Sequence, residues 1–302
     1  MAERTARLIV SERVSEPLQV EFPMRRRMHL VPAGTLGRLL LAILFAGISM
    51  FPLLYMVSLS FQPIGQILTF PPILLPVHPT WQNYVQAWTE NSFAQYFFNS
   101  LYVSFGTVLL SVLVSVLTAF GFARYKFSGR NVLFYFLLSS LAVPSILLIM
   151  PQYMLMKDLG LLNSRVGLVL LYTAGNIPFN VFLLRNFFQA IPKDLEDSMR
   201  LDGTSEAGLL VHLIAPLSIP ALVSVSMFTF NGAWDEFIIA LTMINSPARR
   251  TLPIALAMFQ NEHTTAWGAL FAATTIATVP QILVFAITQR WFQEGMSVSV
   301  PT

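Results

Sequence analysis

Six long apolar runs constrain this chain more than any other feature of its sequence. They lie at approximately 36–61, 98–122, 131–155, 166–187, 214–244 and 269–292. About 20 apolar residues cross the roughly 30 Å hydrocarbon core of a bilayer as a helix. These runs are continuous, whereas a transmembrane barrel strand alternates apolar and polar residues over about ten positions. We therefore predict an all-α membrane protein with six transmembrane helices over residues 36–292, flanked by tails at 1–35 and 293–302.

The composition agrees with lipid as the solvent for most of the chain. Hydrophobic residues make up 55% and charged residues only 11%, whereas soluble domains are about a quarter charged. The absence of cysteine excludes disulfides and thiolate metal sites. No basic patch with interleaved aromatic residues accompanies the net charge of +3, so no nucleic acid is expected as a partner. Prolines inside the runs predict a packed bundle of kinked helices; they include Pro52, Pro144, Pro178, Pro220 and Pro280.

The distribution of lysine and arginine predicts the orientation of the helices. Fourteen of the 18 basic residues fall on one side, which includes the N-terminal tail and the second and fourth connections. The four on the other side are Lys157, Arg165, Arg249 and Arg250. Because cytoplasmic loops carry the excess of basic residues, we expect both termini in the cytoplasm. The chain is accordingly expected in the cytoplasmic (inner) membrane of a bacterium or archaeon, with the lipid bilayer as a partner.

A polar segment interrupts this pattern between the fourth and fifth runs. Residues 191–206 hold five of the fifteen acidic residues, namely Asp194, Glu196, Asp197, Asp202 and Glu206. Pro192 suits the start of a helix, and Glu196 and Arg200 are spaced as an i,i+4 ion pair. Gly203 suits the end of that helix, where a left-handed residue is needed.

A second helix is expected to follow the glycine. Ser205 or Thr204 can cap it, and an apolar stripe continues from it into the fifth run through Leu209, Leu210, Leu213 and Leu217. We therefore predict a cytoplasmic helix–turn–helix at about 192–213 with an acidic outer face. The alternative interpretation is an ordinary amphipathic connector that is solvated on one side.

This segment resembles the EAA loop of binding-protein-dependent ABC importers, whose pattern is E-A-A-x-x-D-G-A followed by I-x-L-P-x-x-x-P. Asp202-Gly203, Pro216 and Pro220 fall at the offsets of that pattern. The chain departs from it at Asp197-Ser198-Met199, which replaces Glu-Ala-Ala, and at Thr204 and Ala215. Asp197 keeps a carboxylate at the acidic position, with a side chain shorter by one methylene.

Other motifs extend the resemblance over nearly everything after residue 36. They are similar to those of carbohydrate-uptake permeases of the maltose-importer type. They include Asn99-Ser100, Leu159-Gly160-Leu161-Leu162-Asn163 and Phe230-Asn231-Gly232-Ala233-Trp234-Asp235-Glu236-Phe237. The resemblance implies the permease fold of type I ABC importers and the transport of a carbohydrate, polyol or oligosaccharide.

The resemblance also implies partners and a mechanism. The chain would form half of a pore, together with a second homologous permease chain, two ATPase subunits and an extracytoplasmic solute-binding protein. The loop at 192–213 would dock into the ATPase and move as a rigid lever. The residues assigned to this coupling are Asp197, Ser198, Arg200, Asp202, Gly203, Glu206 and Pro216.

The absence of a phosphate-loop motif also indicates that ATP is bound by another chain. A phosphate loop needs Gly-Lys followed by Ser or Thr, and the three lysines follow Tyr125, Met156 and Pro192. No cofactor is therefore expected on this chain, and ATP and Mg would belong to the partner ATPase. The four histidines show no spacing typical of zinc or of a catalytic triad. We expect no metal site, no catalytic residues and no enzymatic activity.

Polar residues within the spans are candidates for a substrate pathway. Asn176 and Asn180 are one helical turn apart, as are Asn231 and Asp235, with Glu236 adjacent. Hydrogen bonding between helices is the alternative role for the two asparagines of the fourth run. For Asp235 and Glu236 the alternative is a position at the lipid headgroups or an interhelical bond.

A secondary transporter driven by an ion gradient is the alternative function. Such a transporter would favour inverted repeats and acidic residues near the middle of the membrane. Neither feature is evident in this sequence.

Overall fold

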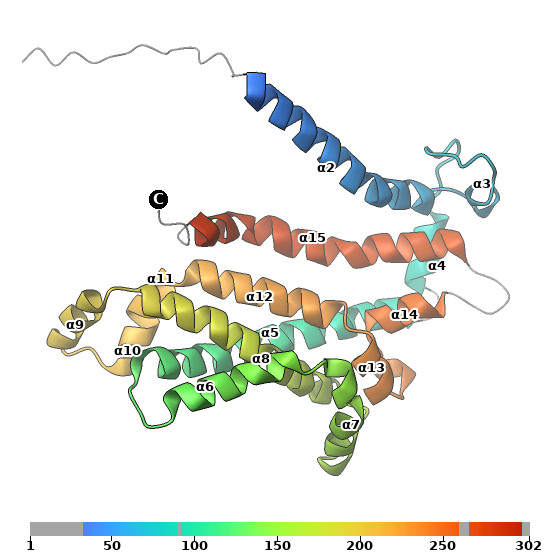
Figure 1. Ribbon diagram of the computed structural model, residues 1–302. Helices are drawn as coiled ribbons and strands as arrows, with labels where there is room; N and C mark the ends of the chain where they lie inside the picture. Colours follow the sequence, from blue (N-terminus) through green and yellow to red (C-terminus); the bar gives the residue numbers. More distant parts are fainter. Residues whose placement is uncertain (1–32, 90–91, 260–265, 298–302) are drawn as a thin grey trace, which may run out of the picture. The chain divides into compact units, whose positions relative to one another are not determined.

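The computed structural model describes residues 33–89, 92–259 and 266–297 (Figure 1). It divides into two compact units, residues 1–51 and 52–302. Helix α2 (Ala33–Ser60) begins in the first unit and continues through Pro52 into the second. Most of the predicted N-terminal tail, residues 1–32, lies outside the described residues. The predicted C-terminal tail is helical up to Ser297, and residues 298–302 lie outside the description.

The described part of the second unit consists of helices and turns. After α2 it contains α3 (Ile64–Ile67), α4 (Gln82–Thr89), α5 (Phe93–Arg124), α6 (Arg130–Ser139), α7 (Ile149–Asp158), α8 (Arg165–Ala190), α9 (Lys193–Leu201), α10 (Glu206–Leu209), α11 (Ala215–Leu217), α12 (Ile219–Trp234), α13 (Ile238–Met243), α14 (Leu252–Met258) and α15 (Trp267–Ser297). Short 3-10 helices lie at η2 (Ser140–Ala142), η3 (Ser145–Leu148) and η5 (Pro247–Arg249), and a π-helical turn at η4 (Leu210–Ile214).

Four described helices are long and apolar enough to cross a membrane: the Gly37–Ser60 part of α2, α5, α8 and the Trp267–Trp291 part of α15. Two further candidates are helix pairs with a sharp bend. The bend is 96° between Arg130–Ala142 and Ser145–Asp158, and 80° between Glu206–Leu217 and Ile219–Trp234. If each bent pair is one span, the described residues contain the six spans expected from the apolar runs.

Prolines lie at both bends. Pro144 follows Val143, whose backbone is extended, as expected before a residue whose ring clashes with a preceding helical turn. Pro220 is the second residue of α12, directly after the break at Ser218, and its missing N–H is tolerated in a first turn. Pro52, Pro178 and Pro280 lie within the continuous helices α2, α8 and α15.

Helix α5 is at the centre of the second unit. It packs along α8 and against α12, and α12 packs against α15 (Figure 1). Small side chains on one face of α5 are fully buried, which allows close approach of neighbouring helices; they are Ser104, Thr107, Ser111 and Ser115. Figure 1 shows α9 and α10 at one end of this bundle and α7, α13 and α14 at the other.

Candidate functional site

The predicted helix–turn–helix is present at the end of the bundle. Helix α9 begins directly after Pro192, and Gly203 follows its end with a φ of +79°. The Gly203 N–H donates to Arg200 O at 3.0 Å, and the Thr204 N–H donates to Met199 O at 3.1 Å. This pair of bonds is the Schellman arrangement, which needs a left-handed residue at the glycine position. Local sequence therefore explains the turn completely.

The second helix is capped and anchored as its sequence suggests. Ser205 Oγ accepts a hydrogen bond from the Gly208 N–H at 3.2 Å. Leu209 and Leu210 are buried in the core next to α8, and Leu213 packs against the same cluster. Leu217, which the apolar stripe included, is 51% exposed instead.

Arg200 connects the two helices of the turn. Its guanidinium donates to Asp197 Oδ1 at 3.2 Å on α9 and to Glu206 Oε1 at 3.1 Å on α10. The hydrogen bond to Glu206 is the main cause of a raised pKa for Arg200, which keeps it charged. Ser198, Asp202 and Pro216 are exposed. The turn therefore presents Asp197, Ser198 and Asp202 on its outer surface.

The expected i,i+4 ion pair of Glu196 with Arg200 is present at 3.6 Å, but Glu196 does not contribute to the acidic outer face. This side chain is only 1% exposed and forms an ion pair with Arg124, the last residue of α5, which is 5% exposed. Arg124 Nη2 also donates to Phe188 O near the end of α8 at 2.5 Å. The carboxylate is buried here because a cation from another helix meets it, and the Phe188 carbonyl accepts a hydrogen bond from that same cation. The sequence carries no signal for this pair, because its partners lie on separate helices.

The two asparagines of α8 do not act together. Asn180 is fully buried and donates to Thr229 Oγ1 on α12 at 3.0 Å. Asn176 donates to Tyr172 O of its own helix at 2.8 Å. The hydrogen bond of Asn180 links two helices, as the alternative role anticipated.

Glu236 forms an interhelical bond, which was the alternative to a role in the pathway, and it also caps a helix. Its carboxylate accepts hydrogen bonds from the Ile239 N–H at 2.7 Å and the Ala240 N–H at 2.9 Å, in the first turn of α13. It also accepts from the Tyr172 hydroxyl of α8 at 2.6 Å. A negative charge is favourable at a helix N-terminus. Glu236 thus caps one helix and connects it to another.

Asn231 and Asp235 differ in their surroundings, although they are one helical turn apart. Asn231 Oδ1 is buried and has no hydrogen-bond partner within the described part of the chain. Asp235 is exposed, and its carboxylate accepts from Gln281 Nε2 of α15 at 2.8 Å. A cavity of about 130 Å³ borders Asp235 but not Asn231, and its polar lining includes Asp235, Thr274, Thr278 and Gln281.

At the end of the bundle opposite α9 and α10, two asparagines from the motifs that resemble the permease family hold the loop after α13 in place. Asn99 Nδ2 donates to Ala248 O at 3.0 Å and to Arg250 O at 2.9 Å, while Asn99 Oδ1 accepts from Arg165 at 2.8 Å. Asn163, with a φ of +54°, accepts from the Ser246 N–H at 2.9 Å. These asparagines therefore fix the chain after α13 to the starts of α5 and α8.

Comparison with known proteins identifies related sequences. A family model described as "Binding-protein-dependent transport system inner membrane component" matches residues 111–298. A diacetylchitobiose uptake system permease protein of Streptomyces coelicolor is 32% identical over 252 residues, covering 83% of each chain. A trehalose/maltose transport system permease protein of Thermococcus litoralis is 32% identical over 259 residues, covering 85% of this chain and 92% of the relative.

Solved structures show the same fold. A chain of a bacterial ABC transporter involved in the import of the acidic polysaccharide alginate aligns with a TM-score of 0.76. The alignment covers 86% of this chain and 96% of that chain, at 23% sequence identity.

Proposed function

The chain belongs to the family of binding-protein-dependent transport system inner membrane components, and we propose that it is the permease subunit of an ATP-driven importer. It forms half of a translocation pore, and a second homologous permease chain forms the other half. Two ATPase subunits bind ATP and Mg, and an extracytoplasmic solute-binding protein delivers the substrate. The family match over residues 111–298, which includes the turn at 192–213, carries this proposal.

The substrate class in this proposal is a carbohydrate or a related polyol or oligosaccharide. Support comes from the names of relatives, which include uptake systems for diacetylchitobiose and for trehalose or maltose. A third relative, a permease of Agrobacterium fabrum that is 31% identical, is named for sulfoquinovosyl glycerol transport. Calorimetric titration of the cognate binding protein with these sugar classes tests the substrate, and exclusive binding of a non-carbohydrate would contradict it.

The turn at 192–213 is the proposed contact with the ATPase, on the cytoplasmic side together with both termini. Asp197, Ser198 and Asp202 form its exposed surface, while Arg200 holds α9 to α10 as one body. The buried pair of Arg124 and Glu196 connects that body to α5. A movement imposed on the turn is therefore transferred to a transmembrane helix rather than absorbed in a flexible loop.

Two substitutions of Gly203 test this coupling. Proline fixes φ near −65° and removes the N–H that bonds to Arg200 O, so Gly203→Pro breaks the Schellman turn. Asparagine tolerates a left-handed conformation, and a Cβ at this position meets no atom within 4 Å. Gly203→Asn is therefore the matched control and should retain most transport.

Uptake and substrate-stimulated ATP hydrolysis are measured on the purified complex of permeases and ATPase. We expect Gly203→Pro to insert normally and to lose both activities. Substrate-stimulated ATP hydrolysis at the wild-type rate in that variant would contradict the proposal that the turn at 192–213 acts as a rigid lever. The alternative, an ion-coupled secondary transporter, requires no ATPase, so failure of any ATPase to co-purify with the chain would favour it.

A further inference from the structure

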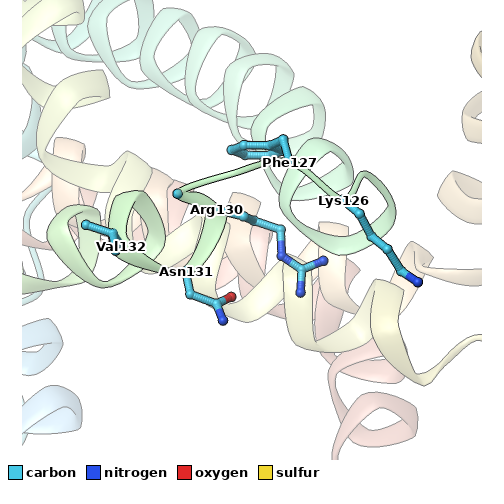
Figure 2. A pocket seen from close by; sticks show the side chains of 6 residues that line it. Lys126, Phe127, Arg130, Asn131 and Val132 are labelled. Carbon is cyan, nitrogen blue, oxygen red and sulfur yellow. The ribbon is translucent and has the colours of Figure 1, made fainter.

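The turn between α5 and α6 contains a basic pocket that the transport proposal does not use. It has a volume of about 290 Å³ and is lined by Lys126, Phe127, Gly129, Arg130, Asn131 and Val132. Figure 2 shows the side chains of Lys126 and Arg130 extending from the turn toward the same side. The pocket therefore combines two cationic groups with an aromatic and an aliphatic side chain.

Three basic residues at or beside this pocket, Lys126, Arg130 and Arg185, form no ion pair with an acidic residue within the described part of the chain. Arg124 and Arg200 take part in all four ion pairs found there, and Lys126, Arg130 and Arg185 in none. Arg130 Nη1 donates only to the backbone oxygen of Tyr125, at 3.3 Å. Like charges that gather without a counter-charge repel one another, so an anion bound among them is stabilised.

A third cation lies beside the pocket. The Arg185 guanidinium of α8 is 4.0 Å from the centre of the Phe134 ring of α6. It is close enough to Arg130 for their positive charges to repel each other. Its Nε is buried without a hydrogen-bond partner among the described residues. The positive field at this turn therefore comes from two separate parts of the chain.

The pocket is at a membrane surface, because the two helices that the turn joins are candidate membrane spans. It is on the same side as the turn at 192–213, since the adjacent Arg124 contacts Glu196. Large apolar side chains next to the cations are exposed: Phe127 by 45%, Val132 by 72% and Phe136 by 76%. A soluble anion would make no favourable contact with these apolar side chains, whereas a lipid would contact them with its acyl chains.

We propose that this pocket binds the phosphate group of an anionic phospholipid. Arg130 offers a planar pair of donors to the phosphate oxygens, and Lys126 adds a mobile point charge. The apolar side chains beside them contact the glycerol and the first carbons of the acyl chains. The site does not depend on the transport proposal, because a permease and a secondary transporter would both place this turn at the lipid headgroups.

Native mass spectrometry of the full-length chain in detergent tests the site, with phosphatidylglycerol and phosphatidylcholine as probes. The variant is Lys126→Gln/Arg130→Gln. Near a membrane surface each basic residue contributes about 1 kcal/mol, or roughly fivefold in affinity. We therefore expect the double variant to bind phosphatidylglycerol about 25-fold more weakly and phosphatidylcholine as before.

The matched control removes two positive charges elsewhere. Lys157 and Arg290 are exposed and form no ion pair in the described structure, so Lys157→Gln/Arg290→Gln has the same net charge as the test variant. The control should bind phosphatidylglycerol within about twofold of the wild type. Equal losses in the two double variants would mean non-specific attraction and would overturn the proposal.

Two further measurements, competition by inorganic phosphate and binding of the ATPase, distinguish a lipid from a soluble anion and from a protein contact. Displacement of phosphatidylglycerol by inorganic phosphate at comparable concentration would identify a soluble-anion site and contradict the lipid. Retained lipid binding with loss of the ATPase from the variant complex would identify a protein contact and also contradict it. Unchanged ATPase binding together with lost phosphatidylglycerol supports the proposal.

Discussion

Arg124 and Glu196 form an ion pair in which both side chains are almost completely buried, at 5% and 1% exposure. Arg124 ends α5 and Glu196 lies in α9, so the pair joins a transmembrane helix to the turn that we assign to ATPase contact. The backbone oxygen of Phe188 brings the end of α8 to the same guanidinium. Three helices therefore converge on one cation at the base of the turn.

Removal of Arg124 should destabilise the protein strongly. Arg124→Ala removes the buried cation and leaves Glu196 only its longer contact with the partly exposed Arg200, at 3.6 Å; breaking a buried pair costs about 3–5 kcal/mol. Arg200→Ala is the control, because the partly exposed guanidinium of Arg200 pairs with Asp197, Glu206 and, at 3.6 Å, Glu196, and such exposed pairs are worth at most about 1 kcal/mol each. Thermal unfolding in detergent, followed by tryptophan fluorescence, measures both. Comparable stability in the two variants would show that the buried pair does not hold the turn.

The bond between Tyr172 and Glu236 should contribute to stability more than to substrate affinity. A hydrogen bond to a charged group is worth about 1.5–3 kcal/mol, and Tyr172→Phe removes this one without changing the ring. A double-mutant cycle with Glu236→Gln should give a coupling free energy in unfolding. We expect the KM for uptake to change less than twofold in Tyr172→Phe. Additive effects on unfolding would contradict the interhelical role.

Gly268 should not tolerate a methyl group. A Cβ at this position would lie 2.5 Å from Asn83 Oδ1. Asn83 is itself held by Ser60 O at 2.9 Å and Gln62 O at 2.8 Å. We expect Gly268→Ala to destabilise the protein by about 1–3 kcal/mol through overpacking. Gly121→Ala is the control, since a Cβ there meets no atom within 4 Å. If both variants unfold at the same temperature, the Asn83 side chain moves aside without loss of stability, and the overpacking argument is wrong.

Asn180 should contribute to helix packing and not to transport. Interhelical polar bonds in membranes average about 0.6 kcal/mol in double-mutant cycles, and we expect a similar coupling between Asn180→Ala and Thr229→Ala. Uptake kinetics should be unchanged in Asn180→Ala once expression is matched. A KM raised tenfold or more would instead place Asn180 in the substrate pathway.

Asn231 is predicted to behave in the opposite way. Its Oδ1 has no hydrogen-bond partner within the described residues, so Asn231→Ala loses no bond of that oxygen and should unfold like the wild type. If Asn231 contacts substrate, the KM for uptake rises while thermal stability stays constant. An unchanged KM would remove it from the candidate pathway.

Sequence reasoning succeeded where neighbouring residues decide the structure. The membrane-crossing segments follow from long apolar runs, and the bends follow from Pro144 and Pro220. The end of α9 follows from Gly203, and the cap of α10 from Ser205. The spans depend on the apolar side chains of one continuous segment, and the bends, the helix end and the cap depend on residues within about five positions of one another.

Tertiary structure decided how far each carboxylate is buried. Glu196 and Asp197 are adjacent in the sequence, yet Glu196 is buried against Arg124 and Asp197 is exposed. Glu236 and Asp235 are likewise adjacent, yet Glu236 caps α13 and Asp235 borders a cavity. A buried charge depends on donors that other helices bring to it, and hydropathy or spacing along one segment does not encode them.

For this protein, the sequence alone determined the apolar spans and the acidic turn, because lipid burial and helix termination are local properties of the chain. Only the packing of α5, α8 and α9 determined that one acid of that turn is its anchor. The other acids of the turn are less buried, because a carboxylate is costly to bury unless a counter-charge is brought to it.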